Sequence, residues 1–346
     1  MALMKSVRLY KAGDLRVERV ERPGAPRPGW VRLAVKAAGI CGSDLHNFRT
    51  GQWISRSPSV AGHEFAGEVL AIGEGVKTVG VGDKVVADSR FWCGECDACR
   101  AGLRQVCEQL GFVGEVCDGG FAEETELPER LLIRHDAGLD PAIAAFSEPL
   151  AVALHAVRRL GAPEGEPVLV VGCGPIGGLA ALLLSRLHKG PILVADRNEA
   201  RATLVGHVAG GQTVALDRQA LQSAAGGRPV RFAIDATGNV SVLEQLVDIL
   251  SPAGAIALVG ISHGKIALDP NRLVEREMAL IGCHAFAGEL GEAVAMLADL
   301  APALTRLIDA EISLDDVPAA YDRLLAGQAA GLKTIIRMDR TGPGRA

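Results

Sequence analysis

Two patterns of hydrophobic and polar positions divide the chain near residue 149. Up to that point, short segments in which apolar and polar residues alternate lie between Gly and Pro residues, as in VRLAVKAAGI, FAGEVLAIG and GDKVVADS. Alternation with a period of two is typical of strands that bury one face. Residues 1–149 are therefore predicted to form an all-β region with loops.

Continuous apolar runs alternate with helical stretches after residue 149. The helical stretch PIGGLAALLLSRL lies between the predicted strands PVLVVG and PILVAD, and EARATLVGHVA lies between PILVAD and QTVALD. Apolar strands joined by helices are typical of a doubly wound parallel sheet. We therefore expect an α/β domain over residues 150–289, with strands in PVLVVG, PILVAD, QTVALD, VRFAIDATG, GAIALVGIS and MALIGCHA.

The last segment, residues 290–346, combines both kinds of element. It contains two helical stretches, AVAMLADL and VPAAYDRLLAG, and then a strand, KTIIRM. We expect this segment to return to the β-rich domain of residues 1–149.

Length and composition limit the class of protein. A chain of 346 residues can form two domains that each bury a core without cross-links. The N-terminus lacks the apolar segment of a secretory signal, and no apolar run approaches the roughly 20 residues that span a bilayer. We therefore expect a cytoplasmic protein with no membrane partner. A net charge of −5 with interspersed signs also argues against nucleic acid as a partner.

Four of the eight cysteines lie in one stretch, RFWCGECDACRAGLRQVC. Disulfides, a redox centre and a metal site are the competing interpretations, and a reducing compartment disfavours disulfides. The C-x2-C-x2-C-x7-C spacing allows four thiolates to surround one Zn²⁺. This closed set favours structural zinc over an iron–sulfur cluster or unliganded thiols. The predicted ligands are Cys93, Cys96, Cys99 and Cys107.

A glycine-rich turn, GCGPIG, directly follows the strand PVLVVG and opens a predicted helix. This is the context of a dinucleotide-binding loop, because the glycines allow a tight turn and the close approach of a pyrophosphate to the helix N-terminus. Asp196 ends the next strand and would accept hydrogen bonds from the adenosine ribose, which favours NAD over NADP. The alternative is a plain tight turn with Asp196 as a helix cap.

Residues close to these strand ends complete the predicted cofactor site. Arg197 and Arg201 could reach the 2′-phosphate of NADP, but we expect Asp196 to outweigh them. Cys173 is interpreted as a packing residue between the glycines. The predicted cofactor contacts are Gly172, Gly174, Pro175, Ile176, Gly177, Asp196, Arg197, Arg201, Thr237 and Gly260.

A second set of candidate metal ligands is spread along the first domain: Cys41, His63, Glu64 and Glu148. One thiolate, one imidazole and one or two carboxylates can leave a zinc position open for substrate. Taken singly, each residue also has an ordinary interpretation. Cys41 would be a small buried hydrophobe, His63 a hydrogen-bonded polar residue and Glu148 an acid at a helix end.

The motifs along the whole chain resemble the zinc-dependent medium-chain dehydrogenases, and most closely their polyol, sugar-acid and threonine dehydrogenase branch. GICGSDLH, AGHEFAGEV, GDKVV, CGECDACRAGLRQVC, DGGFAEE, SEPLAVALHA and GCGPIG occur in the same order and at similar intervals. The resemblance implies a GroES-like catalytic domain built from residues 1–149 and 290–346, with a structural zinc lobe at residues 90–108. It also implies an inserted Rossmann domain and assembly into a homodimer or homotetramer.

The same resemblance implies roles for individual residues. Cys41, His63 and Glu64 would bind a catalytic zinc, with Glu148 as an alternating or water-mediated ligand. The chain would then hold two zinc ions, one catalytic and one structural. Ser43 and His46 match the positions that pass the alcohol proton towards solvent while hydride is transferred to NAD⁺.

Two departures bear on the substrate. Relatives usually carry an aromatic residue after the relay histidine and an arginine after the last Rossmann strand, where this chain has Asn47 and Ala285. The missing arginine removes a partner for a carboxylate, although the neighbouring His284 could replace it. We predict oxidation of a secondary alcohol in a polyol or sugar-derived substrate. The alternatives are an L-idonate-like sugar acid, L-threonine or 2,3-butanediol, or a non-catalytic zinc protein.

Overall fold

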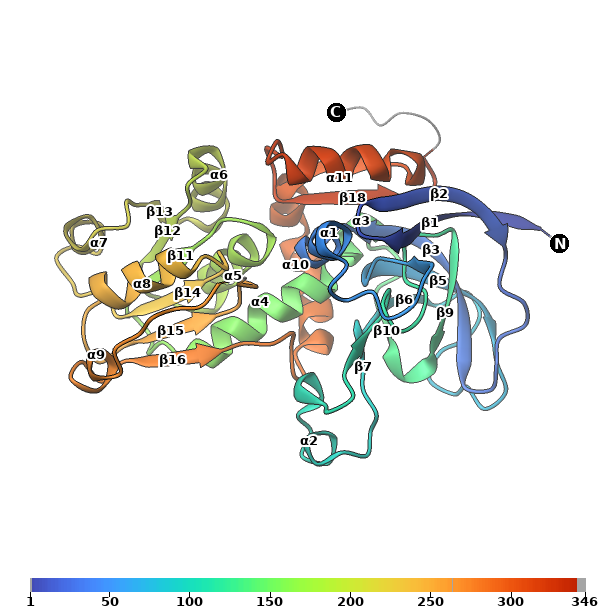
Figure 1. Cartoon of the computed structure of the whole chain (residues 1–346), viewed down its shortest axis with the longest axis horizontal. Coiled ribbons are helices and arrows are strands. Elements are labelled where there is room, and N and C mark those ends of the chain that lie inside the picture. The colour runs from blue at the N-terminus through green and yellow to red at the C-terminus, as the bar shows by residue number, and fades with distance from the viewer. Residues whose placement is uncertain (1, 263, 341–346) are drawn as a thin grey trace. The chain divides into compact units, whose positions relative to one another are not determined.

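The computed structural model describes residues 2–262 and 264–340, which form two compact units (Figure 1). The second unit is Pro149–Glu289, and the first contains the described residues on either side of it. The segment that begins at Leu290 therefore packs with the start of the chain.

The first unit is built on antiparallel strands. Its largest sheet has the order β10-β6-β5-β3-β18-β17, with β9 paired to β3, and a smaller sheet has the order β2-β1-β4. The strands are β1 (Leu3–Lys11), β2 (Asp14–Glu21), β3 (Trp30–Gly39), β4 (Ser59–Val60), β5 (Glu64–Ile72), β6 (Lys84–Ala87), β7 (Arg90–Phe91), β8 (Gly111–Phe112), β9 (Glu124–Pro128), β10 (Leu132–Arg134), β17 (Ile308–Ile312) and β18 (Lys333–Arg337).

The expectation of an all-β region before residue 149 is wrong wherever helices form, above all at residues 42–50. GSDLHNFRT forms helix α1 (Gly42–Thr50), which ends where Gly51 adopts a left-handed conformation with φ of 69°. The buried residues of α1 are polar, so it lacks the apolar periodicity that reveals a helix. The other helices and 3₁₀ turns of this unit are α2 (Asp97–Arg100), η1 (Arg104–Val106), η2 (Glu129–Leu131), α3 (Pro141–Ala144), α10 (Leu290–Leu307), η3 (Leu314–Asp316) and α11 (Val317–Leu325).

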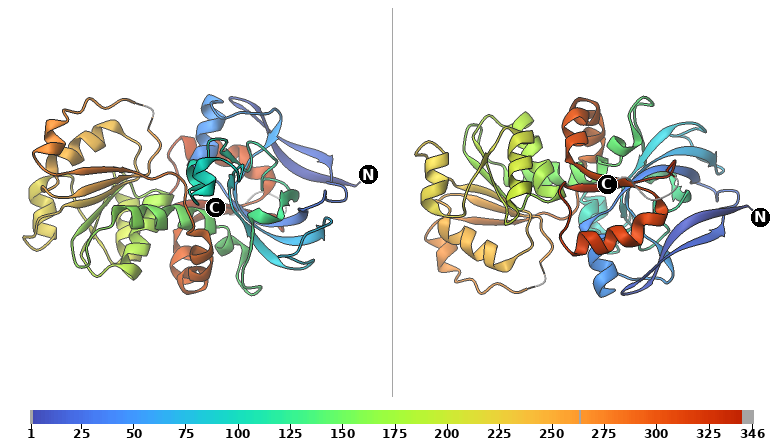
Figure 2. Two further views of the ribbon diagram at one scale, coloured as in Figure 1. Left: turned by 90° about the horizontal axis from the view of Figure 1, so that it is seen from below. Right: turned by 90° about the horizontal axis from the view of Figure 1, so that it is seen from above.

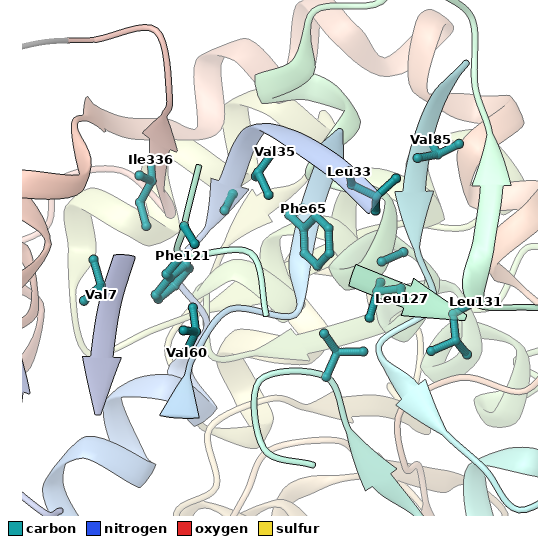
Figure 3. Packing of buried hydrophobic residues seen from close by; sticks show 14 of the residues in the cluster. Val7, Leu33, Val35, Val60, Phe65, Val85, Phe121, Leu127, Leu131 and Ile336 are labelled. Atoms are coloured by element: carbon teal, nitrogen blue, oxygen red, sulfur yellow. The ribbon is translucent and has the colours of Figure 1, made fainter. Parts of the chain in front are cut away.

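The core of the first unit joins residues from both ends of the chain. Figure 3 shows Phe65 and Phe121 among aliphatic side chains that include Val7 and Ile336. Phe65 and Phe121 are at most 1% exposed, so burial of their rings contributes strongly to the stability of this unit. Tyr321 of α11 belongs to the same cluster.

The second unit is a doubly wound parallel sheet, as the apolar runs predict. The strand order is β13-β12-β11-β14-β15-β16, and every pairing is parallel. Figure 2 views this sheet edge-on, with helices on both of its faces. Its elements are β11 (Val168–Val171), α5 (Pro175–Leu187), β12 (Ile192–Ala195), α6 (Glu199–Ala209), β13 (Gln212–Thr213), α7 (Arg218–Ala224), β14 (Phe232–Asp235), α8 (Val240–Ile249), β15 (Ala255–Leu258), α9 (Asn271–Val274) and β16 (Ala279–Gly282).

Helix α4 (Ser147–Leu160) contains the boundary between the units, since Glu148 belongs to the first and Pro149 to the second. Among the described helices, none is long and apolar enough to cross a membrane.

Candidate active site and metal centres

The four cysteines of the lobe surround one point. Cys93, Cys96, Cys99 and Cys107 offer sulfur atoms that all lie within 4.8 Å of one another. Individual Sγ–Sγ separations are 3.5 Å for Cys93 and Cys107 and 3.9 Å for Cys96 and Cys107. Four sulfurs at about 2.3 Å from a central Zn²⁺ in a tetrahedron would be about 3.8 Å apart, whereas a disulfide needs about 2.05 Å. The geometry therefore fits zinc and does not fit disulfides.

Local backbone structure places these thiols. The lobe is the excursion between β7 and β8, which pair antiparallel, and α2 lies at its far end (Figure 1). Cys96 caps α2 and accepts a hydrogen bond from the backbone N–H of Cys99, and the N–H of Cys96 donates to Cys93 Sγ. Hydrogen bonds from the N–H groups of Glu108 and Cys99 lower the pKa of the Cys96 thiol to about 6. Hydrogen bonds from the N–H groups of Cys93 and Gln109 likewise lower the pKa of the Cys107 thiol, whereas burial raises the pKa of Cys99 to about 12. The loop thus favours the thiolate, the form that binds zinc, at Cys96 and Cys107.

The second ligand cluster is assembled by strand register. Gly39 at the end of β3 pairs with Glu64 at the start of β5, so Cys41 and His63 lie beside each other. Cys41, His63 and Glu64 offer ligand atoms within 4.8 Å of one another. A sulfur, an imidazole nitrogen and a carboxylate oxygen are a ligand set that zinc accepts. The structure therefore brings together three of the four ligands that the resemblance implies.

Lys333 pairs with Glu64 in the interior. Lys333 begins β18, and Ile335 of that strand pairs with Gly39 of β3. The Lys333 Nζ lies 2.8 and 2.6 Å from the two carboxylate oxygens of Glu64, and both side chains are 1% exposed. Burial opposes the charge of Lys333, but Glu64 and Cys41 raise the pKa of its ammonium. The candidate ligand Glu64 is thus held in a buried ion pair.

Asp44 connects the helix α1 cap to His63. Its Oδ2 accepts a hydrogen bond of 2.9 Å from the N–H of Cys41, and its Oδ1 lies 3.6 Å from His63 Nδ1. A carboxylate behind a metal-binding histidine orients the ring and leaves the other nitrogen for the metal. Burial opposes protonation of His63, but Asp44 and Cys41 raise its pKa well above the usual value. This concentration of negative groups suits a divalent cation.

Glu148 lies next to this cluster without joining it. Its carboxylate is 5% exposed and accepts a hydrogen bond of 2.7 Å from the fully buried hydroxyl of Ser89. Burial raises the pKa of Glu148 to about 7, opposed by His63 and reinforced by Glu64. The role of Glu148 as an alternating or water-mediated ligand stays a prediction.

The two predicted relay residues have different surroundings. The Ser43 hydroxyl lies 3.4 Å from His63 Nε2, directly beside the ligand cluster. The Nε2 atom of His46 lies 3.0 Å from Gln52 Oε1 and 3.2 Å from Thr50 Oγ1. The passage of a proton from Ser43 to His46 stays a prediction.

A small pocket opens beside Ser43 and His63. The Asn47 amide is in its wall, where Oδ1 accepts a hydrogen bond from the N–H of Trp53. Burial raises the pKa of Glu115, in the same wall, to about 7. The pocket is lined by Leu9, Leu15, Ser43, Asp44, Asn47, Ala61, His63, Val113, Gly114, Glu115 and Tyr321.

The glycine loop of the second unit has the shape that a dinucleotide needs. Gly172 adopts φ of 91°, which favours glycine, and a Cβ on Gly177 would collide with the backbone oxygen of Gly172. A Cβ on Gly174, by contrast, would meet nothing within 4 Å, so the backbone is open to a phosphate there. Pro175 and Ile176 open helix α5, whose N-terminus attracts anions.

Asp196 is anchored beside this loop. Its Oδ2 accepts a hydrogen bond of 2.6 Å from the N–H of Cys173, and its Oδ1 accepts one of 2.7 Å from the N–H of Asn198. Arg197 is exposed, and Arg201 lies in the first turn of α6. Cys173 is fully buried, in line with its interpretation as a packing residue. The ribose contact of Asp196 stays a prediction.

The remaining predicted cofactor residues follow β14 and β15. The Thr237 hydroxyl donates a 2.6 Å hydrogen bond to Asp235 Oδ1, and Gly260 lines a cavity that Gly238 also lines. A Cβ on Gly260 would collide with the backbone nitrogen of Gly238. Ala285, which stands where relatives carry an arginine, has φ of 49°.

Sequence reasoning missed several groups around the mixed cluster: Asp44, Ser89, Glu115, Tyr321 and Lys333. Two of them have a sequence feature that could have identified them. Lys333 is a charge that opens an apolar strand, and Asp44 lies inside the motif GICGSDLH. Ser89 and Glu115 stand in segments without such a contrast.

Comparisons with known proteins agree with this arrangement. The family models for an alcohol dehydrogenase GroES-like domain and a zinc-binding dehydrogenase match residues 27–137 and 175–299. L-galactonate-5-dehydrogenase of Escherichia coli K12 is 34% identical over 258 residues, 72% of this chain and 74% of that protein. L-threonine 3-dehydrogenase of Pyrococcus furiosus is 32% identical over 281 residues, 79% of each chain.

Solved structures with bound cofactors share the whole fold. A zinc-binding dehydrogenase of Sinorhizobium meliloti 1021 bound to NADP has a TM-score of 0.86 at 28% identity and covers 97% of this chain and 100% of its own. An alcohol dehydrogenase of Escherichia coli CFT073 with NADH has a TM-score of 0.88 at 29% identity and covers 98% of this chain and 100% of its own.

These matches confirm the predicted GroES-like and Rossmann architecture, the enzyme class and the need for zinc and a nicotinamide cofactor. They also confirm the resemblance to the branch that includes sugar-acid and threonine dehydrogenases. The chain therefore belongs to the zinc-binding medium-chain dehydrogenases, which interconvert secondary alcohols and ketones with NAD(P).

Proposed function

We propose that this dehydrogenase uses NAD⁺ to oxidise a neutral polyol at a secondary alcohol that has a neighbouring hydroxyl. One observation supports the neutral substrate most directly: neither lysine nor arginine is among the described residues that line the pocket beside Ser43 and His63. A substrate carboxylate bound there would lack the charge-assisted partner that an arginine provides.

The proposed mechanism assigns one function to each group. When bound, zinc supplies Lewis-acid polarisation of the substrate hydroxyl, and NAD⁺ supplies the hydride acceptor. Cys41, His63 and Glu64 would hold the metal, with Asp44 fixing the His63 ring. Ser43 would take the substrate proton, and its Oγ, 3.4 Å from His63 Nε2, supports that role. His46 would pass that proton towards solvent.

The structural zinc and the cofactor choice belong to the same proposal. Cys93, Cys96, Cys99 and Cys107 would hold a zinc that takes no part in the reaction, because four thiolates leave no open position. Asp196 would bind the adenosine ribose and repel a 2′-phosphate, although a similar structure binds NADP. The eight thiols in the described part of the chain suit a cytoplasmic enzyme, and we propose a homodimer or homotetramer as its assembly.

Sugar acids and threonine are the competing substrates. L-galactonate-5-dehydrogenase and L-threonine 3-dehydrogenase, both similar to this chain, are named for substrates that carry a carboxylate. In their favour, His284 or an arginine of a neighbouring subunit could supply the missing charge.

The experiment is a panel of alcohols tested with NAD⁺ and with NADP⁺. The panel contains D-sorbitol, 2,3-butanediol, L-idonate and L-threonine, and kcat/KM is measured for each. We expect the highest value for a neutral polyol with NAD⁺. An aldonate or threonine that exceeds every neutral alcohol would contradict the proposed substrate, and a preference for NADP⁺ would contradict the role of Asp196.

A further inference from the structure

Glu115 places an acid in the wall of the pocket beside Ser43 and His63. Its side chain is partly buried, and in the described part of the chain its carboxyl group has neither a hydrogen-bond donor nor a salt-bridge partner. Most buried or partly buried carboxylates have such a partner, because removing the charge from water costs free energy. Neither carboxyl oxygen of Glu115 is among the fully buried, unpartnered side-chain atoms of the described residues, so the group is solvent-accessible and available to a ligand in the pocket.

The backbone of Glu115 is fixed independently of its side chain. Its carbonyl accepts a 2.8 Å hydrogen bond from Ser55 Oγ, and its N–H donates a 3.0 Å hydrogen bond to the carbonyl of Phe112. Gly114, the preceding residue, adopts φ of 90°. The loop thus holds this position whether or not the side chain carries charge, which argues against a purely structural role for the carboxyl group.

The other polar residues that line the pocket are Ser43, Asp44, Asn47, His63 and Tyr321. Ser43 and His63 mark the side where the reacting alcohol would bind, and Asp44 behind His63 adds negative charge. Asn47 presents an amide whose oxygen is already used by the Trp53 N–H. With two acids and neither lysine nor arginine among its described residues, the pocket favours ligands that donate hydrogen bonds and disfavours ligands that carry negative charge.

We propose that Glu115 is a specificity-determining residue, whose carboxylate binds a hydrogen-bond donor of the substrate and rejects substrates with a carboxylate at that place. The donor is a hydroxyl group next to the reacting carbon in a polyol, and an ammonium group meets the same requirement. A hydrogen bond to a charged group raises the affinity for the donor ligand about tenfold to a hundredfold, and repulsion lowers the affinity for an anionic ligand. Both effects therefore increase the preference for the donor over the carboxylate. This inference rests on the proposed function, since it assigns the substrate class of the same site.

The test compares D-sorbitol with L-idonate in the zinc-loaded full chain, its Glu115→Gln variant and a control variant. Gln keeps the shape and removes the charge. We expect the ratio of kcat/KM for sorbitol to that for L-idonate to fall about tenfold or more in Glu115→Gln, mainly because KM for L-idonate falls. L-threonine carries both an ammonium and a carboxylate group. If Glu115 binds an ammonium donor, the affinity for L-threonine should fall in Glu115→Gln, and if it binds a hydroxyl donor, that affinity should not fall.

The control is Glu74→Gln, which removes an exposed acid of the same unit that is outside the pocket and leaves the ratio unchanged. Calorimetric titration of sorbitol and L-idonate into each variant with NADH gives the same ratio as dissociation constants, without turnover. A ratio that changes by less than about threefold in both measurements would refute the role of Glu115. Absence of turnover with every alcohol would instead refute the proposed function, and the calorimetric ratio would still decide the role of Glu115.

Discussion

The two ligand clusters of the first unit are built in opposite ways. The four-cysteine cluster comes from one stretch of chain, residues 93–107, and backbone N–H groups within that stretch donate to its sulfur atoms. The mixed cluster joins Cys41 after β3, His63 and Glu64 at the start of β5, and Lys333 at the start of β18. One site is a local loop, and the other is a product of sheet register.

This difference indicates how a substitution in each metal site should affect stability and turnover. The lobe has four equivalent thiols and no open position, so a metal there contributes to folding and not to chemistry. At the mixed cluster, His63 has Asp44 as a partner and Glu64 has Lys333, and the nearby Glu148 has Ser89. Changes in that cluster should therefore separate into effects on turnover and effects on stability.

Cys41→Ser should have the largest effect, and it should be on turnover. A catalytic metal ion is worth several kcal/mol of transition-state stabilisation, so we expect kcat/KM to fall about a thousandfold or more. Thermal melting should change little, because the strands around Cys41 keep their pairing. The matched control is Cys117→Ser, a cysteine of the same unit outside both clusters. Turnover within tenfold of wild type would contradict the catalytic role of Cys41.

Cys96→Ser should reverse this pattern. Loss of a structural metal is among the few changes that cost more than about 4 kcal/mol, so the melting temperature should fall clearly. Metal analysis should find about two zinc ions per wild-type chain and about one in this variant. The remaining folded enzyme should keep its kcat at low temperature. Unchanged zinc content and melting would contradict the structural site.

The contrast also explains how much could be predicted from the sequence. The four-cysteine site was evident because its ligands are close in sequence, and the glycine loop was evident because a strand and a helix flank it. Helices Pro175–Leu187 and Glu199–Ala209 have the bounds of the helical stretches that were predicted there. Local patterns thus determined the elements of the second unit.

The partners in the mixed cluster could not be predicted in the same way. Lys333 lies 269 positions from Glu64 along the chain, and only the pairing of β18 with β3 and of β3 with β5 brings them together. Helix Gly42–Thr50 was missed because it buries polar residues. The position of Glu115 in the pocket wall could be recognised only from the structure.

Lys333→Met tests the buried ion pair with a smaller expected effect. Breaking a buried pair leaves an uncompensated charge and costs about 3–5 kcal/mol, which denaturant unfolding would measure. The double variant Glu64→Gln/Lys333→Met removes both charges and should recover much of that loss. Equal stability of the single and double variants would show that Glu64 does not depend on Lys333.

Ser89→Ala should have the smallest effect on stability. It tests whether the Ser89 hydrogen bond stabilises Glu148 beside the mixed cluster. The Ser89 hydroxyl is fully buried and donates a 2.7 Å hydrogen bond to Glu148 Oε1. Its loss leaves a buried carboxyl group without that donor, so the free energy of unfolding should fall by about 1–3 kcal/mol. Because burial raises the pKa of Glu148 to about 7, the carboxylate form dominates above that pH. The loss should therefore be larger at pH 8 than at pH 6.

A matched control exists for this last variant in the same unit. Ser6 is equally buried, but in the described part of the chain its hydroxyl has no hydrogen-bond partner. Ser6→Ala should therefore be neutral or slightly stabilising, since it removes a polar group that is desolvated without compensation. Denaturant unfolding of both variants at the two pH values isolates the hydrogen bond from the loss of a buried hydroxyl. If both variants lost the same stability with the same pH dependence, Ser89 would not be holding Glu148.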